Sequence, residues 1–318
     1  MTTYKEIRGT NIEAVASDPS NPVEGQVWYN TTSDVVKGFY ISLGAWSTSV
    51  PINTDRSQFA AAGIQTSSLI FGGSPTPTAA QTELWNGTTW TEVNDLQTGR
   101  ERLAGCGATN TAALAFGGQP PELAITENWN GTNWTEVNDL NEARASLGAA
   151  GINTAALAFG GDPGPKLQLT ESWNGSNWTA VNPMVNTRIE FASFGTNTAA
   201  IAAGGNQVSP KAKTELWNGT NWTEVNVLNS ARARVSGAGT STAGIAFGGD
   251  PSSVAGLTEL WNGTNWTETT DLNVIREKPG ATGTQPAALA IGRNPSSFPL
   301  GQTEAWNLGP QTVTFDVS

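Results

Sequence analysis

Two charged residue types recur along this chain at a fixed interval and are the first candidates for chemistry. Both series step by 44 positions, apart from one final step of 45 among the glutamates. The arginines are Arg56, Arg100, Arg144, Arg188, Arg232 and Arg276. The glutamates are Glu83, Glu127, Glu171, Glu215, Glu259 and Glu304. Carboxylates can serve as catalytic acids or bases, and guanidinium groups can bind anions.

The even recurrence of these residues favours a structural role over a catalytic one. Paired catalytic carboxylates need a singular environment, whereas these glutamates return in every unit of the chain. We therefore predict that the glutamates pair with the arginines through charge-assisted hydrogen bonds that fix the packing of the units. The alternative is a ring of arginines that captures an anionic ligand such as an acidic sugar, which requires unpaired guanidinium groups.

The remaining composition excludes several kinds of site. The chain of 318 residues contains no histidine, which excludes a Ser-His-Asp or Cys-His arrangement and a His-ligated metal or haem. The single cysteine, Cys106, rules out an intramolecular disulfide and a thiolate cluster. We expect neither a cofactor nor a metal. A net charge of -11, from 27 acidic and 16 basic residues, argues against nucleic acid and anionic membrane surfaces as partners.

The chain shows no targeting signal that the sequence alone can identify. No apolar run approaches the roughly 20 residues of a transmembrane helix, and the N-terminal MTTYKEIRGTNIEAV has no hydrophobic core of a signal peptide. We therefore expect a soluble protein without membrane insertion that is not exported by the usual route. For the same reason we expect no glycosylation at sequons such as Asn86-Gly87-Thr88.

The charged series belong to an internal repeat that tryptophans mark most clearly. One tryptophan series is Trp46, Trp90, Trp134, Trp178, Trp222 and Trp266, and the other is Trp85, Trp129, Trp173, Trp217, Trp261 and Trp306. The first keeps the interval of 44 throughout, and the second has one final step of 45. Paired glycines follow the same period, and only the last copy departs, where Arg293 follows Gly292. Independent series in one register identify a repeat.

Each unit of the repeat reads as four short strands. In the copy after Arg100 these are LAGCGATN, TAALAFGG, TENW and NWTEV. The second strand alternates in the two-residue period of a sheet, and its second face carries only small side chains. Small side chains allow close approach near a central axis, so the first two strands are expected on the inside and the tryptophans further out. Asn-Gly between the last two strands signals a hairpin. A unit of this length with four strands predicts a β-propeller blade.

At this level the sequence resembles the kelch repeat family. AALAFGG, then TELWNG, then NWTEV, then an arginine matches the kelch motif over residues 41 to about 308. The resemblance implies a propeller that binds proteins, binds sugars or carries out an oxidation. The copper radical oxidases of this fold need His and Tyr ligands. Here Tyr4, Tyr29 and Tyr40 all lie in the N-terminal segment and no His is present, so that activity is excluded.

Six complete sets of the first three strands follow the six arginines, which predicts six blades. AWSTSV, around Trp46, would supply the fourth strand of the last blade and so close the ring. The alternative uses the C-terminal QTVTFDVS as that strand and leaves the N-terminal strands as an incomplete seventh blade. The predicted fold is all-β: a six-bladed kelch-like β-propeller of four-stranded blades, preceded by a short N-terminal arm. We assign residues 1–40 to the arm and residues 41–318 to the propeller.

The arm has its own sequence character. It contains the turn-forming DPSNP and ends in the hairpin GQVWYNTTSDVVKGFY. This segment resembles the short hairpins that precede the receptor-binding parts of bacteriophage tail-fibre and tail-associated proteins. The resemblance implies that the arm attaches the chain to a virus particle.

Several conspicuous residues are assigned packing roles. Tryptophan is a common platform for sugar rings, but the regular spacing of twelve of them predicts packing along the outer part of each blade. Trp28, in the arm, is either an anchor or a packing residue. Cys106 occupies a small-residue position and is expected to be a buried filler. Arg293 marks either a junction in the ring or a contact.

The loops between the second and third strands are the predicted binding surface. All six differ in sequence and are rich in proline, and the alternation of strand direction places them on one face together with the connections between blades. Loops on a rigid scaffold are where recognition usually resides. The alternative is that they vary because nothing constrains them. The candidate binding residues are Pro120, Pro165, Lys166, Lys211, Lys213 and Phe298.

These observations lead to three functional hypotheses. The first is a non-enzymatic structural or adhesive virion protein, a phage tail fibre or tail-associated component, made in the host cytoplasm. Its arm would bind other virion proteins, and its loops would meet a host-surface glycan, a receptor or another virion protein; self-association into a homo-oligomer is left open. The second is an intracellular kelch-type protein-interaction module. The third is a glycan hydrolase that uses carboxylates alone.

Overall fold

The chain forms two units whose regular secondary structure, in the residues described, is almost entirely β-strand. The computed structural model describes residues 12–20, 26–41, 44–75, 78–162, 168–206, 209–292 and 301–315. One unit comprises Ala45–Asn307, and the other comprises Met1–Gly44 together with Leu308–Ser318. Within these ranges, two short 3-10 helices, η1 (Thr78–Ala80) and η3 (Ser252–Val254), lie in the loops of the larger unit. Within the described ranges no helix has the length and apolar character needed to cross a bilayer.

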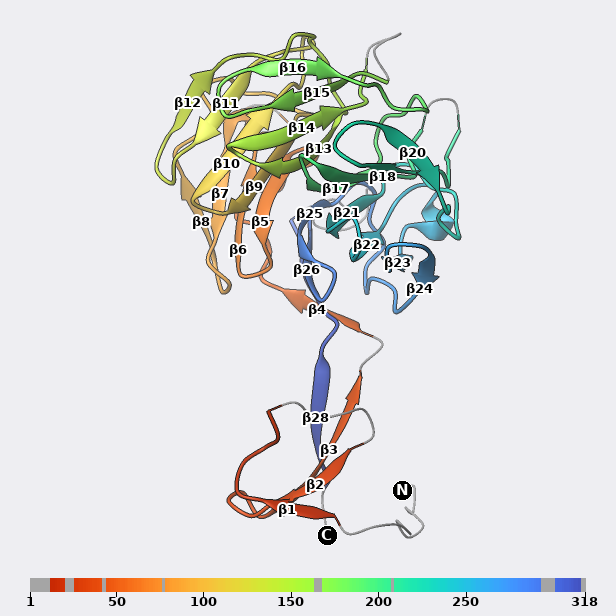
Figure 1. Ribbon diagram of the computed structural model, residues 1–318. Coiled ribbons are helices and arrows are strands. Elements are labelled where there is room, and N and C mark those ends of the chain that lie inside the picture. The colour runs from red at the N-terminus through yellow and green to blue at the C-terminus, as the bar shows by residue number, and fades with distance from the viewer. Residues whose placement is uncertain are drawn as a thin grey trace. The chain divides into compact units, whose positions relative to one another are not determined.

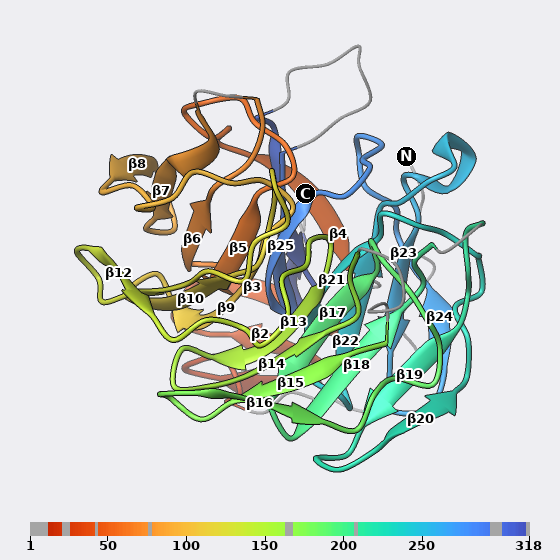
Figure 2. The ribbon, with the colours of Figure 1, turned by 90° about the horizontal axis from the view of Figure 1, so that it is seen from above.

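The larger unit is a β-propeller of six four-stranded antiparallel sheets arranged around a central axis (Figures 1 and 2). This confirms the predicted blade number and the four strands of each blade. Blade 1 contains β5 (Ala60–Ile64), β6 (Ser67–Phe71), β7 (Thr82–Trp85) and β8 (Trp90–Val93). Blade 2 contains β9 (Ala104–Thr109), β10 (Ala112–Phe116), β11 (Thr126–Trp129) and β12 (Trp134–Val137). Blade 3 contains β13 (Gly148–Ile152), β14 (Ala155–Phe159), β15 (Thr170–Trp173) and β16 (Trp178–Val181).

The other three blades continue the same order. Blade 4 contains β17 (Ala192–Thr196), β18 (Ala199–Ala203), β19 (Thr214–Trp217) and β20 (Trp222–Val225). Blade 5 contains β21 (Ser236–Gly239), β22 (Gly244–Phe247), β23 (Thr258–Trp261) and β24 (Trp266–Glu268). Blade 6 contains β25 (Gly280–Thr284), β26 (Ala287–Ile291), β27 (Thr303–Asn307) and, as its outer strand, β4 (Ala45–Ser49).

The first strand of each blade lies innermost, as the small side chains predict (Figure 2). Neighbouring inner strands pack directly against one another around the axis. Gly105 in β9 shows why these positions stay small, because a Cβ atom there would lie 2.4 Å from the ring of Phe71 in the preceding blade. No ordinary Cβ contact is that short, so a larger residue would force the blades apart.

The turn between the third and fourth strands depends on both residues of its Asn-Gly pair. Gly131, between β11 and β12, has φ of 92°, a left-handed conformation that favours glycine. Asn130 acts through its side chain, since its Oδ1 accepts the backbone N–H groups of Thr132 and Asn133 at 2.9 Å each. The asparagine therefore stabilises the turn as a side-chain acceptor.

Tryptophans join each blade to the one before it. The indole of Trp134, in the outer strand of blade 2, packs on Phe71 of blade 1 with ring centroids 4.8 Å apart. Its Nε1 donates to the hydroxyl of Thr82 in blade 1 at 3.0 Å. The same 3.0 Å bond to a threonine of the preceding blade is made by Trp178, Trp222, Trp266 and Trp46. Large apolar burial and a directed hydrogen bond thus fix each of these boundaries.

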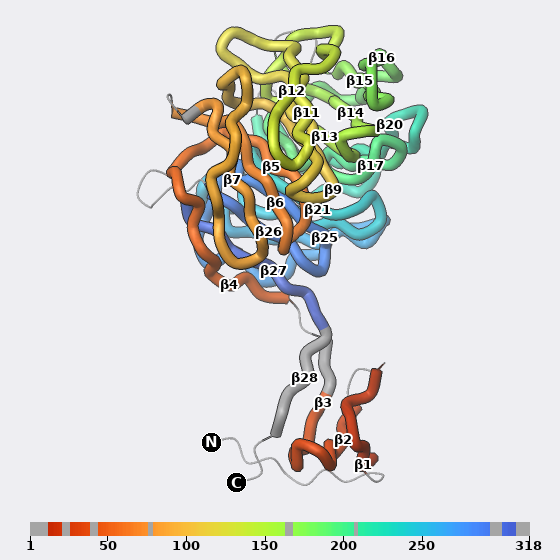
Figure 3. The backbone as a smooth tube through the Cα atoms, turned by 90° about the vertical axis from the view of Figure 1, so that its left-hand side faces the viewer, coloured from red at the N-terminus to blue at the C-terminus, as the bar shows by residue number. Residues whose placement is uncertain are grey.

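The N-terminal strand β4 closes the ring. It pairs antiparallel with β27, with Trp46 opposite Trp306 and Ala45 opposite Asn307, and Figure 3 shows the two strands side by side. The C-terminal segment does not enter a blade, because β28 (Pro310–Phe315) pairs with β3 (Val35–Ile41) instead. The alternative of a seventh, incomplete blade is therefore wrong. The propeller, expected from the sequence to span residues 41–318, ends at Asn307.

The boundary between blade 6 and blade 1 uses its own contacts. In the described part of the chain, Trp90 Nε1 and Thr303 Oγ1 occupy the positions of the repeated Trp–Thr bond but have no hydrogen-bond partner. Instead, the hydroxyls of Ser68 and Thr282 lie 2.7 Å apart across this boundary. The amide of Gln65 also donates to the carbonyl of Trp306 at 2.6 Å. The closure is thus held by substitutions specific to these two blades.

The smaller unit contains a four-stranded sheet in the order β1-β2-β3-β28, with β1 (Glu13–Val15) parallel to β2 (Val27–Asn30). The predicted hairpin is present, since β2 and β3 pair antiparallel. Trp28 is fully buried and donates from Nε1 to Asp18, which favours packing for this residue. Asp18 also accepts hydrogen bonds from Asn30 and Lys37 at 2.7 Å each and so links the chain before the hairpin to both of its strands.

Complementary residue sizes appear between the inner strand of one blade and the second strand of the next. The usual pair is small, as in Ala150 and Ala200. Phe194 in blade 4 faces Gly244 in blade 5, where an added Cβ would lie 2.4 Å from the phenyl ring. One blade thus has a larger residue where its neighbour has a smaller one, and the close packing is preserved.

The complementary sizes of Phe194 and Gly244 predict that substitutions at the two positions have coupled effects on stability. We expect Gly244→Ala to destabilise the protein by about 1–3 kcal/mol, because the methyl group has no room beside Phe194. In a Phe194→Ala background the same change should be stabilising, since alanine is a better strand residue than glycine. Urea unfolding of the four proteins measures the coupling. Equal effects of Gly244→Ala in both backgrounds would show that the two residues do not share space.

Asp18 gives a prediction for the dependence on pH. Hydrogen bonds from Lys37, Asn30 and Trp28 lower the pKa of Asp18 from 3.8 to about 2. A lowered folded-state pKa means that the bonds stabilise the sheet above the unfolded-state value and are lost as the pH falls through about 2. The indole N–H resonance of Trp28, identified by its absence in Trp28→Phe, should therefore stay constant from neutral pH to about 4. It should change only as Asp18 takes up a proton, near pH 2, and Asp18→Asn should abolish this change. A change of the resonance with a midpoint near pH 4 would contradict the hydrogen-bonded arrangement.

Candidate functional site

The periodic arginines and glutamates are brought together within each blade. Every arginine lies just before the inner strand of its blade and reaches the glutamate on the third strand. The nitrogen-to-oxygen distances are 3.2 Å for Arg56–Glu83, 2.5 Å for Arg100–Glu127, 3.0 Å for Arg144–Glu171, 2.6 Å for Arg188–Glu215, 3.0 Å for Arg232–Glu259 and 2.9 Å for Arg276–Glu304. Both side chains of every pair are buried.

Each glutamate also holds the connection between two blades. In blade 2, Glu127 accepts the backbone N–H of Gln97 at 2.7 Å and that of Thr98 at 3.4 Å, both in the connection from blade 1. In blade 6, Glu304 accepts those of Asn273 and Val274 at 2.8 and 3.2 Å. The carboxylate therefore satisfies backbone donors that would otherwise be buried without a partner.

Arginines such as Arg144 also bind backbone carbonyl groups of the same blade, whereas Arg56 donates to the side chain of Gln81. Arg144 donates to the carbonyls of Leu169 at 2.8 Å and Gly160 at 3.1 Å. Its own carbonyl accepts the N–H of Gly118 in the preceding blade at 3.0 Å. Burial lowers the pKa of the Arg144 guanidinium below its ordinary value, while Glu171 acts in the opposite direction. The alternative of an arginine ring that captures an anion is wrong, because these guanidinium groups are buried and engaged.

Loss of one pair should be strongly destabilising. We expect Arg144→Ala to lower the free energy of unfolding by about 3 kcal/mol or more, because Glu171 would remain buried without its counter-ion. Glu122→Gln, an exposed loop change, serves as the control and should alter stability by less than about 0.5 kcal/mol. Urea unfolding followed by tryptophan fluorescence measures both. An unchanged midpoint for Arg144→Ala would overturn the structural role of the pair.

The tryptophans and the cysteine occupy packing positions. The tryptophans of both repeat series are at most 6% exposed, and none of them presents a ring face to solvent as a sugar platform would. Cys106 is buried in β9, and desolvation raises the pKa of its thiol to about 12. A thiol held in its neutral form is unreactive, in agreement with its expected role as a filler.

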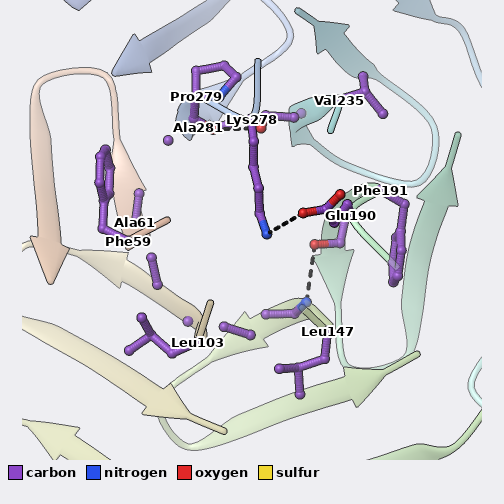
Figure 4. Close-up of a pocket in the computed structure, with 18 residues that line it drawn as sticks. Phe59, Ala61, Leu103, Leu147, Glu190, Phe191, Val235, Lys278, Pro279 and Ala281 are labelled. Carbon is purple, nitrogen blue, oxygen red and sulfur yellow. Dashed lines mark hydrogen bonds and ion pairs between the residues drawn. The ribbon is translucent and has the colours of Figure 1, made fainter. Parts of the chain in front are cut away.

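The central channel opens on the face that carries the blade connections. Two adjoining cavities of about 120 and 110 Å³ lie along it, lined by the inner strands. The larger is bordered by an apolar ring that includes Phe59, Leu103, Leu147, Phe191 and Val235, and Figure 4 shows these side chains around the opening. The second is lined mainly by glycine and alanine. The channel wall is therefore largely backbone.

A ring of left-handed residues surrounds the channel mouth, and sequence reasoning missed it. Its members lie two positions after each periodic arginine and are Gln58, Arg102, Ser146, Glu190, Arg234 and Lys278, with φ between 48° and 58°. Consecutive members are linked by backbone hydrogen bonds, such as Arg102 N–H to Gln58 O at 2.8 Å. Left-handed non-glycine residues are uncommon, and none of these residue types indicates such a conformation in the sequence. Their recurrence at the interval of 44 was the feature of the sequence that could have identified these positions as equivalent.

Charges at the mouth neutralise one another. Lys278 Nζ reaches across the opening to lie 3.6 Å from Glu190 (Figure 4). Arg234 Nε lies 3.2 Å from the same carboxylate. Desolvation acts to raise the pKa of Glu190, but Lys278 and Arg234 outweigh it, so that the pKa lies below its ordinary value. The carboxylate is thus held in its ionised form and closes part of the mouth. This arrangement does not resemble a catalytic acid, which needs a raised pKa.

The loop face is formed as the strand directions predict. In blade 2, Glu101 in the blade connection pairs with Gln119 in the loop after β10, so loops and connections lie side by side. Pro120 and Lys213 are exposed on this face, and Lys211 is partly exposed. Pro165, Lys166, Phe298 and Arg293 lie outside the described residues. The predicted binding residues that the structure describes are therefore dispersed over two blades.

The described residues contain no metal-binding cluster, and two comparisons with known proteins give no match. In the part of the chain that is described, no three Cys, Asp or Glu side chains come together as a metal-binding group would require. A scan against protein-family models gives no match, and a search of curated proteins finds no similar sequence. The fold and the geometry of the loop face are therefore the basis for a functional proposal.

Proposed function

We propose that this chain is a non-enzymatic adhesive and structural component of a virus particle, such as a phage tail fibre or tail-associated protein. In this proposal the propeller presents its loop face to a host-surface receptor or to another virion protein. The smaller unit, which contains the N-terminal arm, attaches the chain to the particle. The observation that carries the proposal is the division between a uniform, buried ion-pair framework and a loop face that differs in every blade.

The uniform part of the propeller supports a holding role. The six glutamates, which are the recurrent candidates for acid or base chemistry, are each committed to an arginine and to backbone donors. A buried carboxylate whose oxygens already accept hydrogen bonds from a guanidinium and from backbone N–H groups is not accessible to a substrate. This favours a binding protein over the carboxylate-based hydrolase.

The loop face has the features of a recognition surface on a rigid scaffold. Its loops begin directly after the paired glycines, whose backbone is tied to the next blade, as in the 2.9 Å bond from Gly73 N–H to Arg100 O. The loops that follow share no residue pattern. Fixed loop ends with variable contents are typical of binding sites built on a stable framework.

The connections to the smaller unit favour a tethered propeller. The chain passes from that unit into β4 and leaves β27 towards it, and these strand ends are paired through Ala45 and Asn307. Both connections lie at the opposite end of blade 6 from its loop face, since β27 runs from that face to Asn307. A binding face remote from both attachment points suits a protein that is anchored at one end. The intracellular kelch-type module gives no role to this second, separate sheet.

Localisation on particles tests the proposal. Antibodies against the purified chain should label the tails of virus particles produced by the source cells in electron micrographs, and an excess of the free chain should compete with particles for host cells. Neighbouring genes should encode capsid or tail proteins. Recovery of the chain only from the cellular fraction, with no label on purified particles, would contradict the proposal and favour the intracellular module.

A further inference from the structure

Because the blades repeat, their equivalent positions can be compared, and contacts that recur among them are absent from part of the loop face. Where the outer strand of a blade meets the next connection, blades 1, 2 and 5 carry an aspartate, namely Asp95, Asp139 and Asp271. Each accepts the first backbone N–H of the third strand in its own blade, at 3.2, 3.0 and 3.3 Å. Blades 3, 4 and 6 have Pro183, Val227 and Pro51 at this position. These side chains cannot accept a hydrogen bond, so a repeated stabilising contact has been given up.

A second repeated contact is missing in the same sector. Four blade connections carry an amide side chain that donates to the carbonyl of a tryptophan in the next blade, as Asn141 does to Trp178 at 3.1 Å. Val185 occupies the equivalent place between blades 3 and 4. It is 52% exposed, and Val227 is 53% exposed. Sites that break the local rules of a fold without a structural gain are where function is expected.

Two lysines accompany the exposed valines. Lys211 and Lys213 lie in the loop of blade 4 at positions where the other blades carry Ala or Leu and Gln, Ile or Leu, respectively. Their backbone is fixed, since Lys211 N–H donates to Gly205 O at 2.9 Å and Lys213 O accepts from Arg188 at 2.9 Å. The two ammonium groups are therefore carried by an anchored segment of the blade.

The lysines border a cavity of about 260 Å³. Its walls are formed by Asn186, Thr187, Arg188, Lys211 and Lys213, which together present an amide, a hydroxyl and two ammonium groups. Lys213 Nζ lies 2.9 Å from Asn186 Oδ1 and 2.7 Å from Glu224. Lys211 Nζ donates to Ser209 at 3.1 Å. Glu224 balances one ammonium group, and Arg188 is paired with Glu215, so one positive charge remains.

The valines and the lysines form one continuous surface. Val185 precedes Asn186, which contacts Lys213. On the other side, Leu228 N–H donates to Ala212 O at 2.9 Å, which places Val227 beside the lysine-bearing loop. We call this set, Val185, Asn186, Lys211, Lys213 and Val227, the basic sector. The exposed acid of the blade 4 outer strand, Glu224, remains beside the sector and is paired with Lys213.

We propose that the basic sector is a binding subsite for one acidic sugar unit of a host-surface glycan. This inference rests on the proposed adhesive function and names the ligand class of its loop face. The ammonium groups would bind the sugar carboxylate, the amide and hydroxyl would bind ring hydroxyls, and the valines would contact the apolar C–H face of the ring. Loss of the repeated aspartates removes carboxylates that would repel such a ligand, and the remaining Glu224 is paired with Lys213.

Two exposed valines, Val227 in the basic sector and Val50 outside it, allow a variant to be compared with a matched control. Val227→Asp restores the residue of the repeat and places a carboxylate beside Lys213, whereas Val50→Asp places one at another exposed valine, 46% exposed, in blade 6. The probe is an array of glycans that bear glucuronate, galacturonate or sialate, each beside its carboxyl-reduced form. The full chain should bind acidic members only. Val227→Asp and Lys211→Ala/Lys213→Ala should weaken binding about tenfold or more, and Val50→Asp should leave it unchanged.

The outcomes separate this inference from the function on which it rests. Binding to neutral glycans alone, or acidic-glycan binding that Val227→Asp leaves intact, overturns the subsite but is compatible with an adhesive role. Binding to no glycan also overturns the subsite, and particle labelling then decides whether the virion proposal stands. Capture of an acidic protein in place of any glycan would assign the basic sector to a protein partner and overturn the sugar assignment. Unfolding curves of all variants establish that each protein is folded.

Discussion

The propeller depends on a buried carboxylate that serves two partners at once. In each blade the glutamate of the third strand neutralises an arginine from the blade connection and accepts backbone N–H groups of that connection, as Glu127 does for Arg100, Gln97 and Thr98. A buried ion pair is stable only where further hydrogen bonds compensate the loss of water. In the propeller that compensation comes from the segment that must turn from one blade into the next. The pair therefore determines the path of the chain as well as the packing of each blade.

At the contacts between blades, a change of residue on one side is matched by a complementary change on the other side. Most boundaries use a tryptophan on a phenylalanine and a hydroxyl acceptor, as Trp134 does with Phe71 and Thr82. Where the ring closes, between blades 6 and 1, the hydroxyls of Ser68 and Thr282 are in contact instead. Between blades 4 and 5, the larger Phe194 is accommodated by the smaller Gly244. A framework of this kind leaves the loop face free to differ among blades, and the basic sector shows such a difference accompanied by the loss of stabilising bonds. Adhesion through that face is the function that this division of roles favours.

Much of this fold could be predicted from the sequence because the repeat places independent residue series in one register. The strands, their order from the axis, and ring closure by β4 all follow from it. The partner of β28 could not be predicted, since an alternating strand pattern does not specify which sheet edge it joins. The left-handed ring at the mouth was missed because residues such as Gln58 and Lys278 carry no conformational signal. The sequence identified Lys211 and Lys213 of the basic sector as candidate binding residues. That Val185 and Val227 lie beside them could be seen only from the hydrogen bonds of the structure.

Native-state hydrogen exchange of the full chain tests most directly whether the glutamates hold the blade connections. The amides that donate to them, including those of Gln97, Val185 and Asn273, should exchange as slowly as the inner strands of their blades. Loops on the binding face, such as the segment around Pro120, should exchange much faster. Connections that exchange as fast as those loops would mean that the buried carboxylates do not fix the chain between blades, and would contradict the central role of the ion pairs in the propeller.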